Sequence, residues 1–181
     1  MSSGRRWTLV ACLLCAPGSA RATDLFGGYS VLRLEGQNAH GAALALSFQL
    51  GHKLRIAAEA TGQSGLVQGE HLREWALLAG PVLAPWRQSW VAPFVHAKAG
   101  LVRSRRQLEV FGVTLGAAGV CNGGCPSETV LAAELGGGLD FRLTSRLALR
   151  LPQVDYRLTR LDTVDPRRLR FSAGVALRWG R

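Results

Sequence analysis

Long apolar runs are missing from this chain of 181 residues. No stretch reaches the roughly 18 apolar residues that a membrane-spanning helix requires, which excludes a polytopic helical membrane protein. Charge is also scarce, because 19% of the residues are charged whereas 48% are hydrophobic. A solvated disordered segment has the opposite balance. The composition indicates one folded domain and also excludes a collagen or a coiled coil.

Acidic residues are few as well. Twelve Asp and Glu stand against 22 Lys and Arg, which gives a formal net charge of +10. A basic excess can indicate a nucleic acid partner. Here the cationic residues alternate with apolar ones and the N-terminus predicts export, so we expect no nucleic acid partner.

The first 22 residues have the order of a secretory signal peptide. A short segment ending in Arg5-Arg6 precedes the apolar run at 7–16, and Ala20-Arg21-Ala22 follows. This order predicts a signal peptide at 1–22 and a mature domain at 23–181. The alternatives are a buried N-terminal helix and a lipoprotein signal at Cys12, although the apolar run before Cys12 is short.

Cysteine is nearly absent from the predicted mature chain. Cys12 and Cys15 leave with the signal, so Cys121 and Cys125 remain, in the segment CNGGC. Zinc would require a second cysteine pair or histidine ligands, and we expect no metal and no cofactor. In an oxidising compartment the pair would form a disulfide that closes a small loop. Two free thiols are the alternative.

Apolar and polar residues alternate in the mature chain with the period of a β-strand. The segment 169–179 is the clearest, because its odd-numbered positions are apolar and its even-numbered positions are small or cationic. Similar segments occupy 24–34, 41–50, 54–63, 73–83, 90–102, 131–141 and 147–158. The phase slips at Pro152, which predicts a β-bulge because proline cannot donate to the ladder.

The predicted strands are long, and their connections alternate in length. Most strands span about 10 residues, close to the 9–11 that cross a tilted bilayer and above the 5–6 of a soluble strand. Short turns are predicted at 51–53, 85–89 and 142–146, and longer loops at 63–71, 103–128 and 159–168, with 35–40 intermediate. This pattern predicts an all-β fold, an eight-stranded antiparallel up-and-down transmembrane β-barrel, with its longer loops outside the cell. Closure is expected because unpaired backbone groups are costly in hydrocarbon.

The two faces of the strands carry different expectations. Apolar residues such as Leu44, Ile56, Leu135 and Val175 should face lipid. Aromatic residues near strand ends should form girdles at the headgroups: Phe26, Trp75, Trp86, Trp90, Phe141 and Trp179. The predicted lumen charge network is Arg55, Glu59, Glu74, Lys98, Glu134, Asp140, Arg150, Asp155, Arg170 and Arg178. Side chains fill a barrel of this size, so these charges should pair into a plug. A narrow gated ion path is the alternative.

Several short motifs resemble those of small bacterial outer-membrane β-barrel proteins. They are Gly27-Gly28-Tyr29-Ser30, Gly80-Pro81, Pro93-Phe94-Val95-His96-Ala97, Gly136-Gly137-Gly138-Leu139-Asp140, Gln153-Val154-Asp155-Tyr156 and the last alternating strand. The set is most similar to barrel-only relatives of the transmembrane domain of outer membrane protein A, over nearly the whole mature chain. The resemblance implies the outer membrane of a Gram-negative-type bacterium, insertion by the barrel assembly machinery, and a monomer. Such chains usually end on an aromatic residue, whereas this one ends Trp179-Gly180-Arg181.

An enzymatic role is not expected. Some eight-stranded outer-membrane barrels modify lipid A with a histidine, a nearby serine and a carboxylate. In this chain Ala97 and Lys98 follow His96, and no inward serine is placed beside the histidine. A nucleophile needs its base within hydrogen-bond reach, so we expect an interior, hydrogen-bonded histidine.

Basic residues at the outer rim suggest a lipid partner. Arg103, Arg105, Arg106, Arg167 and Arg168 would lie at the outer-leaflet headgroups. Phosphates of lipopolysaccharide could accept their charge-assisted hydrogen bonds, or the side chains could simply snorkel at the interface. The expected function is therefore a structural and surface-interaction barrel. A soluble lipocalin-like calyx, of another class, would require apolar residues inside and polar residues outside.

Overall fold

The computed structural model describes residues 22–34, 36–67, 70–86, 89–110, 113–116, 119–120, 127–159 and 168–179. Ten strands are formed in these ranges: β1 (Ala22–Leu34), β2 (Gln37–Gln49), β3 (Leu54–Val67), β4 (Glu70–Leu83), β5 (Val91–Val110), β6 (Val113–Gly116), β7 (Gly119–Val120), β8 (Glu128–Arg142), β9 (Leu147–Thr159) and β10 (Arg168–Arg178). No helix long and apolar enough to cross a membrane occurs in this part of the chain.

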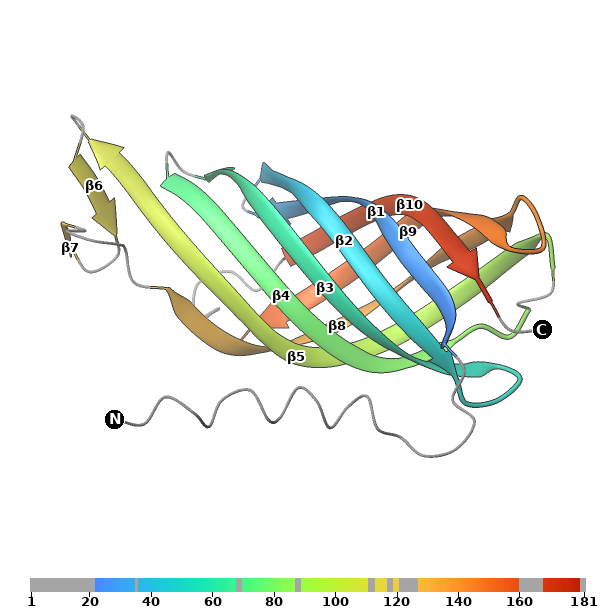
Figure 1. Ribbon diagram of the computed structural model, residues 1–181. Coiled ribbons are helices and arrows are strands. Elements are labelled where there is room, and N and C mark those ends of the chain that lie inside the picture. Colours follow the sequence, from blue (N-terminus) through green and yellow to red (C-terminus); the bar gives the residue numbers. More distant parts are fainter. Residues whose placement is uncertain are drawn as a thin grey trace, which may run out of the picture.

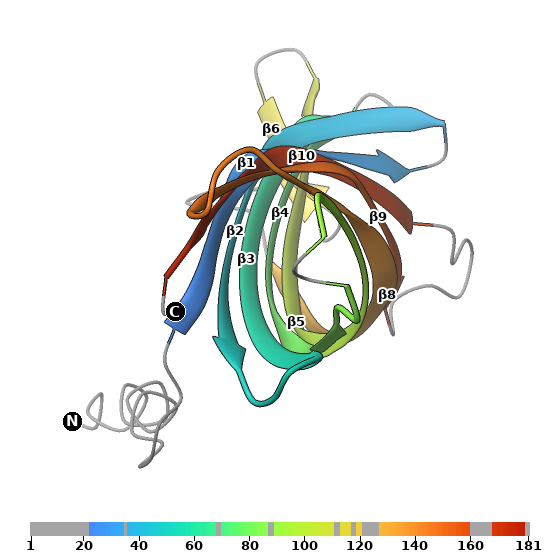
Figure 2. The same cartoon turned by 90° about the vertical axis from the view of Figure 1, so that its right-hand side faces the viewer.

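Eight of the strands close into a barrel. Pairing is antiparallel from β1 through β5, and then from β5 to β8, β9 and β10. The ring is completed by β1 and β10, which pair from Asp24 opposite Arg178 to Arg33 opposite Leu169. Figure 2 shows the resulting ring. Each strand in it has two neighbours, so no edge is left unpaired. The predicted all-β, eight-stranded, antiparallel up-and-down barrel is confirmed.

Two short strands lie outside the ring. The far end of the 20-residue β5 pairs with β6 at Leu108–Val110, and β6 pairs with β7. Figure 1 shows these segments projecting beyond the other strands at one end of the barrel. The predicted loop at 103–128 is thus partly β-strand. Cys121, Cys125 and residues 1–21 of the signal peptide lie outside the described residues, so the disulfide and the signal stay predictions.

Most strands are longer than the hydrophobic pattern predicted, up to 20 residues in β5, whereas β10 has the predicted 11 residues. Although β1 gains its extra residues at the short-turn end, most of the additional residues lie at the long-loop end. There β3 and β4 remain paired up to Val67 opposite Glu70, and β1 and β2 up to Leu34 opposite Gln37. Ladder hydrogen bonds are made by the backbone, so pairing continues where the apolar alternation has stopped. Alternation therefore detects the lipid-facing part of a strand better than its full length.

The β-bulge predicted at Pro152 is confirmed. Pairing along β9 jumps by three positions, from Gln153 to Arg150, while β8 and β10 each advance by two. Leu151 and Pro152 are both exposed. The extra residue allows Arg150 and Gln153 to face the lumen from either side of the bulge.

The faces of the barrel wall are inverted relative to a soluble barrel. Leu44, Ile56, Leu135 and Val175 are 58%, 43%, 65% and 41% exposed. About half of the buried side chains are charged or polar. An apolar outer wall with a polar interior is the pattern of a transmembrane barrel. It contradicts the lipocalin-like alternative, whose interior would be apolar.

Most aromatic residues predicted for the girdles are on the outer surface. Trp75, Trp86, Trp90 and Trp179 are exposed, and Phe141 packs edge-on against Trp90 with 6.1 Å between ring centroids. The prediction for Phe26 is wrong, because its ring is buried in the lumen among four alanines: Ala43, Ala45, Ala148 and Ala176. The lumen therefore contains apolar layers as well as charges.

Candidate functional site

The barrel interior is filled with charged side chains. The structure buries all ten residues of the predicted lumen network: Arg55, Glu59, Glu74, Lys98, Glu134, Asp140, Arg150, Asp155, Arg170 and Arg178. Three further charged residues are buried with them: Asp24, Arg157 and Arg168. Alternation could have identified Arg157, which lies two positions after Asp155, since residues two apart share a face.

Eight of these residues form what we call the central cluster, contributed by β3, β4, β5, β8, β9 and β10. It combines four carboxylates with four cationic side chains: Glu59, Glu74, Glu134, Asp155, Lys98, Arg157, Arg168 and Arg170. Equal numbers of opposite charges allow full pairing without solvent. This matters because an unpaired buried charge is strongly unfavourable.

Arg170 connects three carboxylates from three different strands. Its Nη2 lies 2.8 Å from Glu134 Oε1 and 2.5 Å from Asp155 Oδ2. Its Nη1 forms an ion pair with Glu59 Oε1 on β3. One guanidinium thus joins β3, β8 and β9 to β10 across the lumen, which uses the planar fork of donors that lysine lacks.

Arg157 and Arg168 share a carboxylate on the opposite wall. Arg157 Nη1 lies 2.7 Å from Glu74 Oε1, and its Nη2 lies 2.9 Å from Glu134 Oε2. Arg168 Nη1 donates to Glu74 Oε2 at 2.9 Å. The expectation that Arg168 faces the outer-leaflet headgroups is therefore wrong. Arg168 shares the inward face of β10 with Arg170, two positions along the strand.

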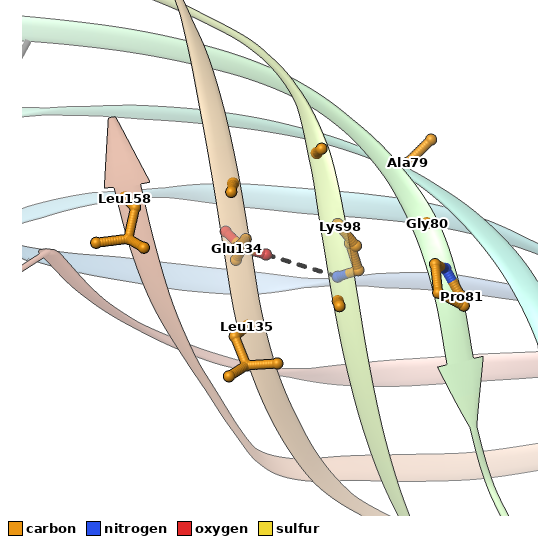
Figure 3. A pocket seen from close by; sticks show the side chains of 10 residues that line it. Ala79, Gly80, Pro81, Lys98, Glu134, Leu135 and Leu158 are labelled. Carbon is orange, nitrogen blue, oxygen red and sulfur yellow. Dashed lines mark ion pairs between the residues drawn. The ribbon is translucent and has the colours of Figure 1, made fainter. Parts of the chain in front are cut away.

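Lys98 and His96 complete the central region. Lys98 Nζ pairs with Glu59 Oε2 and lies 3.6 Å from Glu134 Oε1; Figure 3 shows the second contact as a dashed line. His96 Nε2 lies 2.9 Å from Asp155 Oδ1. The histidine is therefore bound to a carboxylate inside the barrel.

Three of these side chains offer ligand atoms that a metal ion could use. Atoms of His96, Glu134 and Asp155 lie within 4.8 Å of one another. Both carboxylates, however, already bind Arg170. A divalent cation entering here would be repelled by that guanidinium and would have to displace it. The geometry therefore favours a salt-bridged cluster over a metal centre.

A second group of charges, the turn-end cluster, contains Asp24, Arg55, Asp140, Arg150 and Arg178. Arg55 Nη1 pairs with Asp24 Oδ2. Asp140 accepts hydrogen bonds from Arg150 Nε at 2.8 Å and from Arg178 Nη2 at 2.9 Å. The guanidinium carbon of Arg150 also lies 4.8 Å from the Phe26 ring centroid and 4.4 Å from that of Phe94. Two aromatic rings and an ion pair therefore occupy the same layer of the lumen.

We expect Arg150→Lys to lower the free energy of unfolding by about 1–2 kcal/mol, because lysine loses both the forked contact to Asp140 and much of the stacking on Phe26 and Phe94. Urea unfolding of the folded barrel in detergent measures this loss. Arg146→Lys, at an exposed turn position, is the matched control and should change the value by less than about 0.5 kcal/mol. Equal effects of the two substitutions would show that the stacked arginine contributes nothing specific.

The basic residues predicted at the outer rim are only partly described. Arg103 is exposed, and its Nη2 donates to Ser127 Oγ at 2.7 Å. Arg105 is half-buried. Arg167 and the side chain of Arg106 lie outside the described part of the structure. Among the described side chains of the five, Arg103 and Arg105 are thus the two that are not buried in the lumen.

Comparison with known proteins gives a structural likeness. Neisserial surface protein A superposes with a TM-score of 0.60 at 16% identity, covering 87% of this chain and 96% of that one. The attachment invasion locus protein Ail of Yersinia pestis superposes with a TM-score of 0.56 at 15% identity, covering 88% of this chain and 99% of Ail. The N-terminal β-barrel domain of Pseudomonas aeruginosa OprF superposes with a TM-score of 0.56 at 14% identity, covering 87% of this chain and 98% of the OprF domain.

No protein family model and no curated protein sequence matches this chain. At identities this low the structural likeness concerns the fold. The resemblance to small bacterial outer-membrane barrels that the sequence motifs indicated is confirmed at that level. This chain has the eight-stranded β-barrel fold of small bacterial outer-membrane proteins.

Proposed function

We propose that this protein is an outer-membrane β-barrel of a Gram-negative-type bacterium, with a structural and surface-interaction role and a lumen that does not conduct ions. The main support for an outer-membrane location is the polarity of the barrel wall, which is apolar outside and charged inside, the reverse of a soluble barrel. Leucine, valine and tryptophan side chains cover the outside of a closed ring, whereas thirteen charged side chains are buried within it. Such a wall is stable in hydrocarbon and would be poorly soluble in water.

The pairing of the central cluster supports a sealed lumen. Its ion pairs reach across the interior, from Glu59 and Glu74 on one side to Arg157, Arg168 and Arg170 on the other. An ion that passed would have to separate these pairs. A buried charge that loses its partner is strongly unfavourable, so passage of an ion through several pairs in turn would be rare.

A small gated pore is the second candidate, because the interior is polar. Planar bilayer recordings of the purified protein separate the two functions. We expect no stepwise currents from the wild type, whereas a porin reconstituted in the same way supplies the positive control. Discrete openings of the wild-type protein would favour the pore.

A lipid-modifying enzyme is less well supported. The partner of His96 is the carboxylate of Asp155, and the names of the similar structures are those of surface proteins and outer-membrane barrels. The absence of activity stays a prediction. A lipid A mass profile that changes on overexpression, and returns to normal with His96→Ala, would contradict it.

A surface role is consistent with the long-loop end. There β5, β6 and β7 extend beyond the rim of the barrel (Figure 1). The names of two similar structures, a surface protein and an attachment protein, point in the same direction.

Fractionation tests the proposed location. We expect the mature protein to sediment with outer membranes, to resist a carbonate wash, and to migrate faster on gels before boiling than after it. The reason is that a closed barrel stays folded in cold detergent until heat breaks the ring. Release into the soluble fraction would overturn the proposal.

A further inference from the structure

Three arginines gather on the outer wall, near the long-loop end of β4 and β5. Arg73 lies directly opposite Arg105, and the next outward pair toward the middle of the barrel is Trp75 opposite Arg103. Arg73 and Arg103 are exposed and Arg105 is half-buried. We call these three residues the arginine patch.

The patch has no acidic partner in the described residues. Neighbouring outward positions on β3, β4, β5 and β8 carry neutral side chains or histidine: Ser64, Leu66, His71, Gln107 and Thr129. Like charges directly opposite each other on a sheet destabilise it. Arg73 and Arg105 are held in this arrangement on a wall that we place in a membrane. An anion bridging them would remove the repulsion, so the patch is complementary to a negatively charged group.

An apolar hollow lies on the same strands, further toward the middle of the barrel. Below the arginine patch comes a row of leucines, Leu77, Leu101 and Leu131, paired across β4, β5 and β8. The next outward row is Ala79, Ala99 and Ala133, beside Leu158 of β9. These small residues leave a hollow of about 370 Å³, which Leu135 and Leu158 border (Figure 3).

The spacing between patch and hollow suits one lipid molecule. Six positions separate Arg105 from Ala99, which is roughly 20 Å along a strand. Strands of such barrels tilt by about 35–45° from the barrel axis. The distance from Arg105 to Ala99 along the membrane normal is therefore about 15 Å. One leaflet of the hydrocarbon core has this thickness. A headgroup at the patch would therefore place its acyl chains beside the hollow.

We propose that this wall binds lipid A, the phosphate-bearing acylated anchor of lipopolysaccharide, with a phosphate between Arg73 and Arg105 and an acyl chain in the hollow. The inference rests on the proposed outer-membrane location and adds a site to it. Three arginines on two strands match a lipid with two phosphates better than one with a single phosphate. Trp75 lies beside Arg103, where an indole favours the headgroup level.

The test is a lipid titration of the folded barrel in detergent, in which native mass spectrometry measures the fraction of protein that has lipid bound. Its probes are lipid A with both phosphates, the same lipid after phosphate removal, and phosphatidylglycerol. We expect the double variant R73Q/R105Q to bind intact lipid A at least about tenfold more weakly, because charge-assisted hydrogen bonds are lost. Removal of the phosphates should weaken binding to the wild type by a similar factor. The double variant should bind the dephosphorylated lipid as the wild type does.

Matched variants separate the site from general effects. R146Q removes an exposed arginine from the opposite rim and should leave the affinity unchanged. A99F fills the hollow and should weaken binding of both forms of lipid A, whereas A42F, at an exposed alanine of β2, should not. Unchanged binding by R73Q/R105Q, an equal loss with R146Q, or phosphatidylglycerol binding as tight as that of lipid A would overturn the inference. A heat-modifiable shift retained by every variant shows that the barrel itself is intact, so that failure here would leave the proposed location standing.

Discussion

Replacing Arg170 with methionine is expected to lower the free energy of unfolding by about 3–5 kcal/mol. The change removes the guanidinium that binds Glu59, Glu134 and Asp155. Lys98 still contacts Glu59 and Arg157 still contacts Glu134. Within the described part of the chain, the carboxylate of Asp155 keeps only His96 and Gln153 as partners. The loss in unfolding free energy arises mainly because the buried carboxylate of Asp155 no longer has its arginine partner.

Urea unfolding of the barrel in lipid vesicles, monitored by tryptophan fluorescence, measures this effect. Arg33→Met is the matched control, because Arg33 is an exposed arginine of β1, and its effect should stay below about 0.5 kcal/mol. The double variant Arg170→Met with Asp155→Asn should lose less than the sum of the two single changes, since it removes opposite charges together. Additive losses would mean that Arg170 and Asp155 are not coupled, and an Arg170→Met effect no larger than the control would refute the paired lumen.

Gly136→Ala is the second large expected effect, with a loss of about 3 kcal/mol in the free energy of unfolding. A Cβ atom at this position would lie 2.2 Å from Asp155 Oδ1 and 2.5 Å from the carbonyl oxygen of Val154. The carboxylate could move only by leaving His96 and Arg170. The carbonyl belongs to the neighbouring strand β9 and cannot move without disturbing its pairing with β8.

Gly27→Ala provides the control for this substitution. Its Cβ atom would meet only Leu44 Cδ2, at 3.5 Å, which is an ordinary contact. The urea midpoint of Gly27→Ala should therefore stay near that of the wild type, while that of Gly136→Ala falls. If both variants unfold at the same midpoint, the close approach of β8 and β9 does not limit the side chain at position 136.

The orientation of most side chains could be predicted from the sequence. Strand alternation is a local property, so a leucine and the charged residue beside it must face opposite sides wherever the strand lies. Leu135 and Glu134 follow this rule, as do Val175 and Arg170 on their strand. Phe26 and Arg168 were exceptions, because both side chains are buried in the lumen. Phe26 was assigned to a membrane girdle because it is an aromatic residue near a strand end, whereas its position two residues after the inward Asp24 places it in the lumen.

The partners of the lumen charges could not be predicted in the same way. Arg157 and Glu74 are 83 positions apart in the chain. They meet because the ring closes with one particular register between each pair of strands. Alternation specifies the face of a residue but not its height in the barrel. The same holds for Arg73 and Arg105, since nothing in the sequence marked Arg73 until the register of β4 and β5 set it opposite Arg105.

The sequence by itself thus determined the eight strands of the barrel, most of their inward and outward faces, and the bulge at Pro152, because each depends on residues that are close in the chain. Only the tertiary structure decided which charges pair, which glycines must lack a side chain, and where the arginine patch stands above the hollow. These features depend on barrel closure and strand register. Both are set by contacts between distant strands, whose combined geometry no local pattern contains.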